Sequence, residues 1–155
     1  MTSASAAMVI CKTSSTVVVH TGEHLFKVVG HSLVQVRSGL TSETFRVGGY
    51  DWAIVYYPNG LAQLFDDGQF TSVFLKLMRP YESEVNASYS FCLQDPVSPS
   101  TVEKCKFSRP SRKFLFSNGG WCNPEFVSKV DLATSGCLKD DCLVIKCTIE
   151  VYSHQ

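Results

Sequence analysis

The chain has 155 residues, which is the length of one ordinary domain. Lys and Arg together number 14, Asp and Glu also number 14, and the formal net charge is therefore zero. Such a chain has no long-range attraction for phosphates or acidic lipids, which argues against a protein dedicated to binding nucleic acid or membranes. Hydrophobic residues make up 45% of the sequence and charged residues 18%, a balance typical of a folded protein.

The N-terminal residues 1–22 are rich in Ser, Thr and Ala, and they predict a flexible tail whose one candidate strand is the apolar patch at 17–19. After the tail come short segments of alternating polar and apolar residues, separated by turn residues such as Pro58-Asn59-Gly60. We expect strands at 25–31, 44–47, 52–57, 70–78, 86–93, 102–107, 113–116 and 142–151. One short helical turn is expected at 125–129. The pattern predicts an all-β fold, most simply an antiparallel sandwich.

Alternation along the predicted strands assigns side chains to faces. In the strand 70–78, Val73, Leu75 and Leu77 form an apolar face, which we expect to line the core. Phe74 lies on the opposite, mixed face, either half-covered by a second layer or exposed as an anchor for a ligand. In the last strand Cys147 is expected to be buried. Trp52, within an apolar strand, is also expected in the core.

The seven cysteines include no pair with C-x-x-C spacing, and an odd number without a secretory signal predicts free thiols. We therefore expect no metal site and no cofactor. The sequence also lacks a phosphate-binding loop, a G-x-S-x-G motif and a paired-carboxylate motif, so we expect no enzymatic activity. The longest apolar stretches are far shorter than the about 20 residues of a membrane span. A location in the cytoplasm or nucleus follows as the expectation.

Four blocks resemble, in order, segments of MATH (TRAF-like) domains: HLFKVVGHS at 24–32, WAIVYYPNG at 52–60, SVFLKL at 72–77 and the closing segment 131–147. The amino-acid sequence of these blocks is most similar to that of the MATH-BTB proteins of plants, especially grasses. The resemblance implies an antiparallel β-sandwich of about eight strands, with the MATH domain at 23–153 after the tail 1–22.

In MATH-BTB proteins the MATH domain binds short extended Ser/Thr-containing peptides of substrate proteins. The BTB domain that follows dimerises and docks a cullin ubiquitin-ligase scaffold. The resemblance thus implies a substrate-recognition domain of an adaptor for a cullin-based ubiquitin ligase. This sequence ends at Gln155 and contains no BTB domain, so a contact with the cullin is expected only through a BTB domain. The alternative is a stand-alone MATH-only interaction module, a decoy or scaffold. The isolated domain is expected to be a monomer.

The resemblance also implies a peptide-binding groove with an aromatic floor. Carried over by position, the family's Trp-Gly-Phe motif reads Trp-Cys-Asn here, and the two polar residues before it are replaced by glycines. This departure from the family's motif argues against a Ser/Thr-rich ligand. For Tyr89, alternation favours the core, whereas the resemblance favours the groove. Trp121 follows two glycines in a loop-like stretch, and its two alternatives are a groove role, which the resemblance favours, and a structural role. The expected groove residues are Phe74, Tyr89, Phe114, Gly119, Gly120, Trp121, Cys122 and Asn123.

One basic cluster stands out in the sequence, formed by Lys104, Lys106, Arg109, Arg112 and Lys113. With zero net charge and no stacking motif, we do not expect nucleic acid as its partner. We interpret the cluster as a solvated rim of the groove, one that would favour acidic or phosphorylated peptides.

Overall fold

The computed structural model describes residues 8–34, 39–61, 68–79, 84–97, 107–114 and 120–154, without the side chains of 107–113 and 154. The elements in chain order are β1 (Val17–Val29), η1 (His31–Leu33), β2 (Leu40–Thr41), β3 (Phe45–Val47), β4 (Tyr50–Tyr57), β5 (Phe70–Leu77), β6 (Val85–Gln94), β7 (Phe107–Phe114), β8 (Trp121–Ser128), α1 (Lys129–Thr134) and β9 (Cys142–His154).

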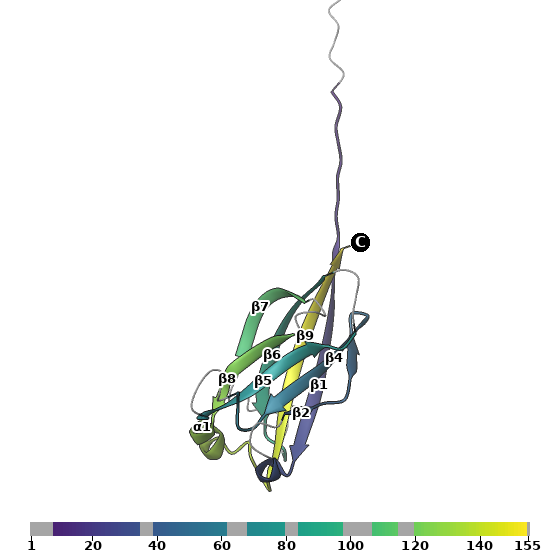
Figure 1. The fold of residues 1–155 in the computed structure, drawn as a ribbon. Coiled ribbons are helices and arrows are strands. Elements are labelled where there is room, and N and C mark those ends of the chain that lie inside the picture. Colours follow the sequence, from purple (N-terminus) through teal and green to yellow (C-terminus); the bar gives the residue numbers. More distant parts are fainter. Residues whose placement is uncertain are drawn as a thin grey trace, which may run out of the picture.

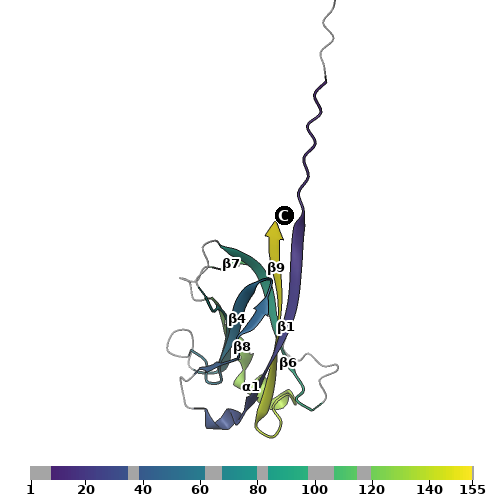
Figure 2. The ribbon, with the colours of Figure 1, turned by 90° about the vertical axis from the view of Figure 1, so that its right-hand side faces the viewer.

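These strands form two antiparallel sheets (Figures 1 and 2). One sheet has the order β1-β9-β6-β7, and the other has the order β2-β4-β5-β8 with β3 paired to β4. In Figure 2 the strands β1, β9 and β6 of the first sheet lie to the right of the strands β4 and β8. The antiparallel sandwich predicted from the sequence is confirmed.

Strands β1 and β9 are 13 residues each and pair along their whole length, from Val17 opposite His154 to Val29 opposite Cys142. β1 therefore begins eight residues before the strand expected at 25–31, and it crosses the expected boundary between tail and domain at residues 22 and 23. The strand extends past this boundary because the apolar residues 17–19 pair with the end of β9. Gly22 lies where a Cβ atom would collide with the Val47 side chain, so the glycine lets β1 approach β3.

The core lies between the two sheets and contains the residues that alternation predicted. Val73, Leu75 and Leu77 of β5 are buried, and so are Trp52 and Cys147, as expected. Because alternate residues of a strand point to opposite faces, this burial directs the intervening side chains of β5 outward from the sandwich.

The one short helical turn expected from the sequence is present but lies later in the chain than 125–129, because residues 125–128 end strand β8 and helix α1 starts at Lys129. The Thr71 hydroxyl donates to the Val127 carbonyl (3.0 Å) and accepts from its N–H (3.3 Å), which holds this part of β8 on β5. The Ser128 hydroxyl then caps α1 by accepting from the Asp131 N–H at 3.0 Å. The Ser-x-x-Asp spacing at 128–131 is a signal that would have located this start.

The strands expected at 102–107 and 113–116 overlap the two ends of β7, and their residues 102–106 and 115–116 lie outside the described residues. In the described part of the chain, no helix is both long and apolar enough to cross a membrane.

Candidate functional site

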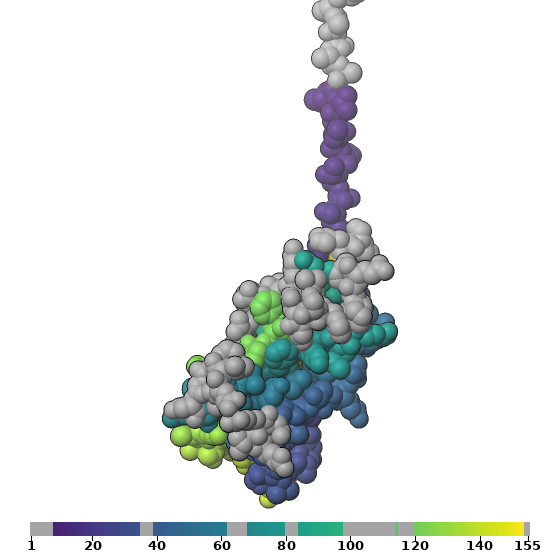
Figure 3. Space-filling view, in the orientation of Figure 1, coloured from purple at the N-terminus to yellow at the C-terminus, as the bar shows by residue number. Residues whose placement is uncertain are grey.

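One of the expected groove residues, Phe74, is a half-exposed aromatic in the middle of the outer face of the five-stranded sheet. Phe74 of β5 points away from the core, between Val55 of β4 and Cys122 of β8, which are its partners in the strand register. All three side chains are only partly buried. In Figure 3, blue-to-teal atoms of β4 and β5 occupy the middle of the visible face.

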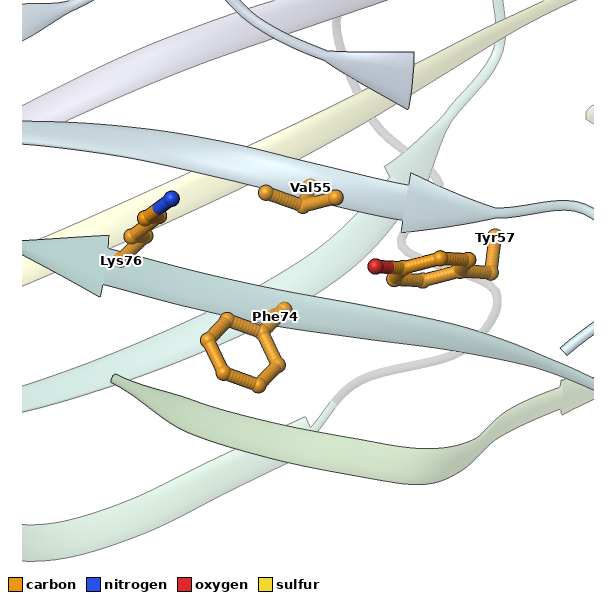
Figure 4. A pocket seen from close by; sticks show the side chains of 4 residues that line it. All are labelled: Val55, Tyr57, Phe74 and Lys76. Carbon is orange, nitrogen blue, oxygen red and sulfur yellow. The ribbon is translucent and has the colours of Figure 1, made fainter. Parts of the chain in front are cut away.

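A pocket of about 220 Å³ opens on this face and is lined by Val55, Tyr57, Phe74 and Lys76. Figure 4 shows the four side chains on the same side of β4 and β5. Lys76 and Tyr57 lie at opposite ends, with Phe74 between them, and the Tyr57 hydroxyl points back toward Val55 and Phe74. The pocket therefore has an apolar centre and a polar group at each end.

Next to Tyr57, Ser72 supports the local shape of the sheet. Its hydroxyl donates to the Pro124 carbonyl at 2.8 Å and accepts from the Leu61 N–H at 3.2 Å. The register of β5 and β8 shifts at this point, between Thr71 and Val73. The hydroxyl thus satisfies backbone groups of β8 and of the turn after β4 where the regular ladder is interrupted.

Gly120 brings the start of β8 close to β5. Its φ of +128° is a conformation that side chains rarely adopt. A Cβ atom there would overlap the Leu75 carbonyl oxygen and lie 2.9 Å from the Phe74 ring. A larger residue does not fit, so the polar groove residue of the family is excluded from this position for a steric reason. Gly119 lies outside the described residues.

The Trp-Cys-Asn segment divides between the two faces of the sheet. Cys122 is opposite Phe74 and faces outward, whereas Trp121 and Asn123 are opposite Leu75 and Val73, the core residues of β5. Trp121 is half-buried and packs edge-on against a core phenylalanine, with ring centroids 6.1 Å apart. Asn123 is only 6% exposed. Neither side chain lies on the face that carries the pocket.

Tyr89 and Phe114 lie in the core. Tyr89 is 3% exposed and Phe114 is fully buried, and their ring centroids are 6.1 Å apart. Trp52 contacts Phe114 edge-to-face at 5.1 Å. For Tyr89, the core alternative from sequence alternation matches this placement. Of the expected groove residues, the structure thus brings Phe74, Gly120 and Cys122 together.

Sequence reasoning missed Val55, Tyr57 and Lys76 as pocket residues. Lys76 was already placed on the same face as Phe74 by alternation, so the signal for it was present. Val55 and Tyr57 alternate with the buried residues of β4, which shows that they face outward. Their position beside Phe74 depends on the register between β4 and β5, which alternation does not supply.

The basic cluster contributes no described side chain to the site. Lys104 and Lys106 lie outside the described residues, and Arg109, Arg112 and Lys113 lie in the part of β7 whose side chains are not described.

A separate polar network joins η1 to the turn before β9. The His31 Nε2 atom lies 2.9 Å from the Tyr56 hydroxyl, and the Asp141 carboxylate accepts hydrogen bonds from the Ser32 N–H (2.9 Å) and hydroxyl (2.6 Å). Burial lowers the pKa of His31, and the negative charge of Asp141 partly offsets this effect. The hydrogen bonds from Ser32 lower the pKa of Asp141. The network joins the segment after β1 to the turn before β9, and none of its residues lines the described pocket.

The described cysteines range from exposed to buried. Cys11, Cys137, Cys142 and Cys147 carry free thiols as expected, and Cys105 lies outside the described residues. Burial raises the pKa of Cys147, and so does the neighbouring Cys92. In the described part of the chain, no three His, Cys, Asp or Glu side chains form a group that could hold a metal ion.

Comparison with known proteins supplies the family. A model of the MATH domain matches residues 23–149. BTB/POZ and MATH domain-containing protein 3 of Arabidopsis thaliana is 33% identical over 138 residues, which cover 84% of this chain and 33% of that protein. Protein 5 of the same series is 33% identical over 154 residues, covering 92% of this chain and 37% of that protein. The chain spans about a third of the length of these curated relatives. It belongs to the MATH domain family.

Proposed function

We propose that this chain binds a short extended peptide of a partner protein across the outer face of β4, β5 and β8, as the substrate-recognition domain of a MATH-BTB type adaptor. The observation that carries the proposal is the half-exposed Phe74 beside a pocket in the middle of a sheet. Membership of the MATH family and the MATH-BTB relatives support a protein-interaction domain of this type.

The dimensions of the site suit a peptide. The pocket of about 220 Å³ is large enough for one side chain, and is below the usual size of a small-molecule site. Aromatic side chains such as Phe74 and Tyr57 offer a large contact area with few rotatable bonds to immobilise. A single apolar side chain of the peptide would therefore serve as the anchor.

The sheet also offers backbone groups. β8 is the last strand of its sheet, and within the described residues it pairs only with β5. An extended peptide beside such a strand gains main-chain hydrogen bonds, while alternate side chains provide specificity. Cys122 is the residue of this edge strand that lies opposite Phe74 in the register. It is therefore the part of β8 beside which the anchor side chain of the peptide would bind.

The experiment is an array of random extended peptides probed with the wild-type domain, with Phe74→Ala and with Leu25→Ala. Leu25 is a matched control, since it is a half-exposed apolar residue, 53% exposed, on a strand of the other sheet. We expect the wild type and Leu25→Ala to select the same consensus and Phe74→Ala, still folded by thermal unfolding, to lose it. Absence of any selected peptide, or selection unchanged by Phe74→Ala, contradicts the proposal.

The ligase role is a separate step of the proposal, which would act through a BTB domain and a cullin scaffold. A fusion of this chain to the BTB domain of an Arabidopsis relative should direct ubiquitination of a reporter that carries the selected peptide, and Phe74→Ala should abolish it. Peptide binding without ubiquitination would leave the stand-alone interaction module as the function.

A further inference from the structure

We infer that the pocket selects a peptide in which an anionic side chain lies two residues from the apolar anchor, and that Lys76 is the residue that reads this charge. The inference rests on the proposed peptide-binding function. It adds the chemical class of the ligand, which neither the family match nor the relatives provide.

The first observation is the position of the charge. Lys76 lines the pocket at one end, exposed and beside the apolar surface of Phe74 and Val55. It has no ion-pair or hydrogen-bond partner in the described part of the chain. Four other cations there are paired: Arg46 and Arg79 with Asp51, Lys139 with Asp95, and Lys146 with Glu23. The positive charge of Lys76 is thus not neutralised by a described protein group.

The second observation is the spacing. Phe74 and Lys76 are two residues apart on β5 and point to the same face, so their Cα atoms are about 6.6–6.8 Å apart along the strand. A peptide running in extended form along the same direction repeats this spacing, because its own residues two apart also share a face. When the apolar side chain of the peptide packs on Phe74, the peptide side chain two residues away therefore reaches Lys76.

The other end of the pocket fits the same ligand. The Tyr57 hydroxyl points toward the apolar centre (Figure 4), and it has no hydrogen-bond partner among the described residues. A hydroxyl group can donate to a backbone carbonyl or to a polar side chain of the peptide. The site thus has an apolar centre, a neutral donor at one end and a cation at the other, and none of the described side chains that line it is a carboxylate that would repel an anion.

A lysine ammonium binds a carboxylate or a phosphate as a point charge and does not require two-pronged geometry. The shared chemistry of the ligand is therefore an anionic oxygen group, from Asp or Glu or from a phosphorylated Ser or Thr. Peptides that differ only at this position distinguish the two sources.

The test uses the consensus peptide from the array, synthesised with Glu, Gln, phosphoserine, Ser or Lys two residues from the anchor. Binding is measured to the wild-type domain, to Lys76→Met, to Lys76→Glu and to Lys27→Glu. Lys27 is a matched control, an exposed lysine on a strand of the opposite sheet. Thermal unfolding checks that each variant is folded.

We expect the wild type and Lys27→Glu to bind the Glu peptide up to about fivefold more tightly than the Gln peptide, the upper range for an exposed ion pair. Lys76→Met should remove this preference, and Lys76→Glu should reverse it in favour of the Lys peptide. The preference should also weaken in about 1 M salt, where charges are screened within about 3 Å. A gain with phosphoserine over Ser but none with Glu over Gln assigns the anion to phosphorylation.

Two results overturn the inference and differ in what else they remove. If the wild type binds all five peptides equally while Phe74→Ala still loses them, the charge reading is wrong and peptide binding stands. A preference for anions that survives in both Lys76 variants also makes Lys76 the wrong residue. If the wild type binds no peptide, the proposed function fails together with the inference.

Discussion

Replacing Phe114 by alanine distinguishes a core residue from a groove residue. The resemblance to the family places Phe114 in the peptide groove, whereas the structure buries it completely, edge-to-face against Trp52 at 5.1 Å and against Trp121 at 6.1 Å. Removing a buried phenylalanine side chain costs about 3–5 kcal/mol, from lost burial and from the cavity left behind. That is a large part of the about 5–15 kcal/mol that stabilises a typical domain.

The companion variant Phe74→Ala removes a side chain of the same size from the outer face. Full burial of a phenylalanine contributes about 1.5–3 kcal/mol, so a half-buried ring contributes about 1 kcal/mol. Urea unfolding followed by tryptophan fluorescence measures both changes. With a slope of about 2 kcal/mol per molar urea, the midpoint should fall by about 2 M for Phe114→Ala and by about 0.5 M for Phe74→Ala.

The order of the two variants should be reversed for peptide binding: the variant that loses less stability should lose more binding. Peptide binding by Phe114→Ala is assayed without urea, at a temperature where the variant is folded. Phe114→Ala should still bind the selected peptide, and Phe74→Ala should not. The reasoning is refuted if Phe114→Ala lowers the midpoint no more than Phe74→Ala does and abolishes peptide binding instead. Phe114 would then belong to the groove.

Three further predictions concern other parts of the molecule. Gly120→Ala should destabilise the domain more than Gly49→Ala, because both have positive φ but only Gly120 has backbone within reach of a new Cβ; equal midpoints in urea would contradict this. Because burial lowers the pKa of His31 below 6.5, the unfolded state binds more protons than the folded state under mildly acidic conditions, and the free energy of unfolding falls as the pH drops below about 6.5. His31→Gln should reduce that slope, and identical slopes would show that His31 does not contribute. Iodoacetamide should label the exposed Cys11 in the native protein and leave Cys147 unlabelled until urea is added, as mass spectrometry would show; equal labelling rates would contradict its burial.

Much of the fold could be predicted because strand alternation is a local property. The sequence around Phe74 alternates so clearly that its core face was assigned correctly without any knowledge of the partner strands. The start of α1 was misplaced although the sequence contains a Ser-x-x-Asp capping pattern. There the hydrogen bonds between Thr71 and Val127 keep β8 extended, and those bonds join residues 56 positions apart.

The candidate site was only partly predictable, for a related reason. Motif position placed Tyr89 and Phe114 with Phe74 as groove aromatics, but the side of the sheet that a residue faces depends on the register and packing of both layers. In the structure Tyr89 and Phe114 point between the sheets and Phe74 points away from them.

The sequence by itself determined an all-β chain, a net charge of zero, free thiols at Cys11, Cys137, Cys142 and Cys147, and a common face for Phe74 and Lys76 opposite the core face of their strand. These follow from composition and from the two-residue period of a strand. Only the tertiary structure decided that Val55 and Tyr57 complete the pocket, that Gly120 must remain glycine, and that β8 ends its sheet. Each of these depends on which strands become neighbours and at what register, and that is determined by contacts between segments far apart in the chain.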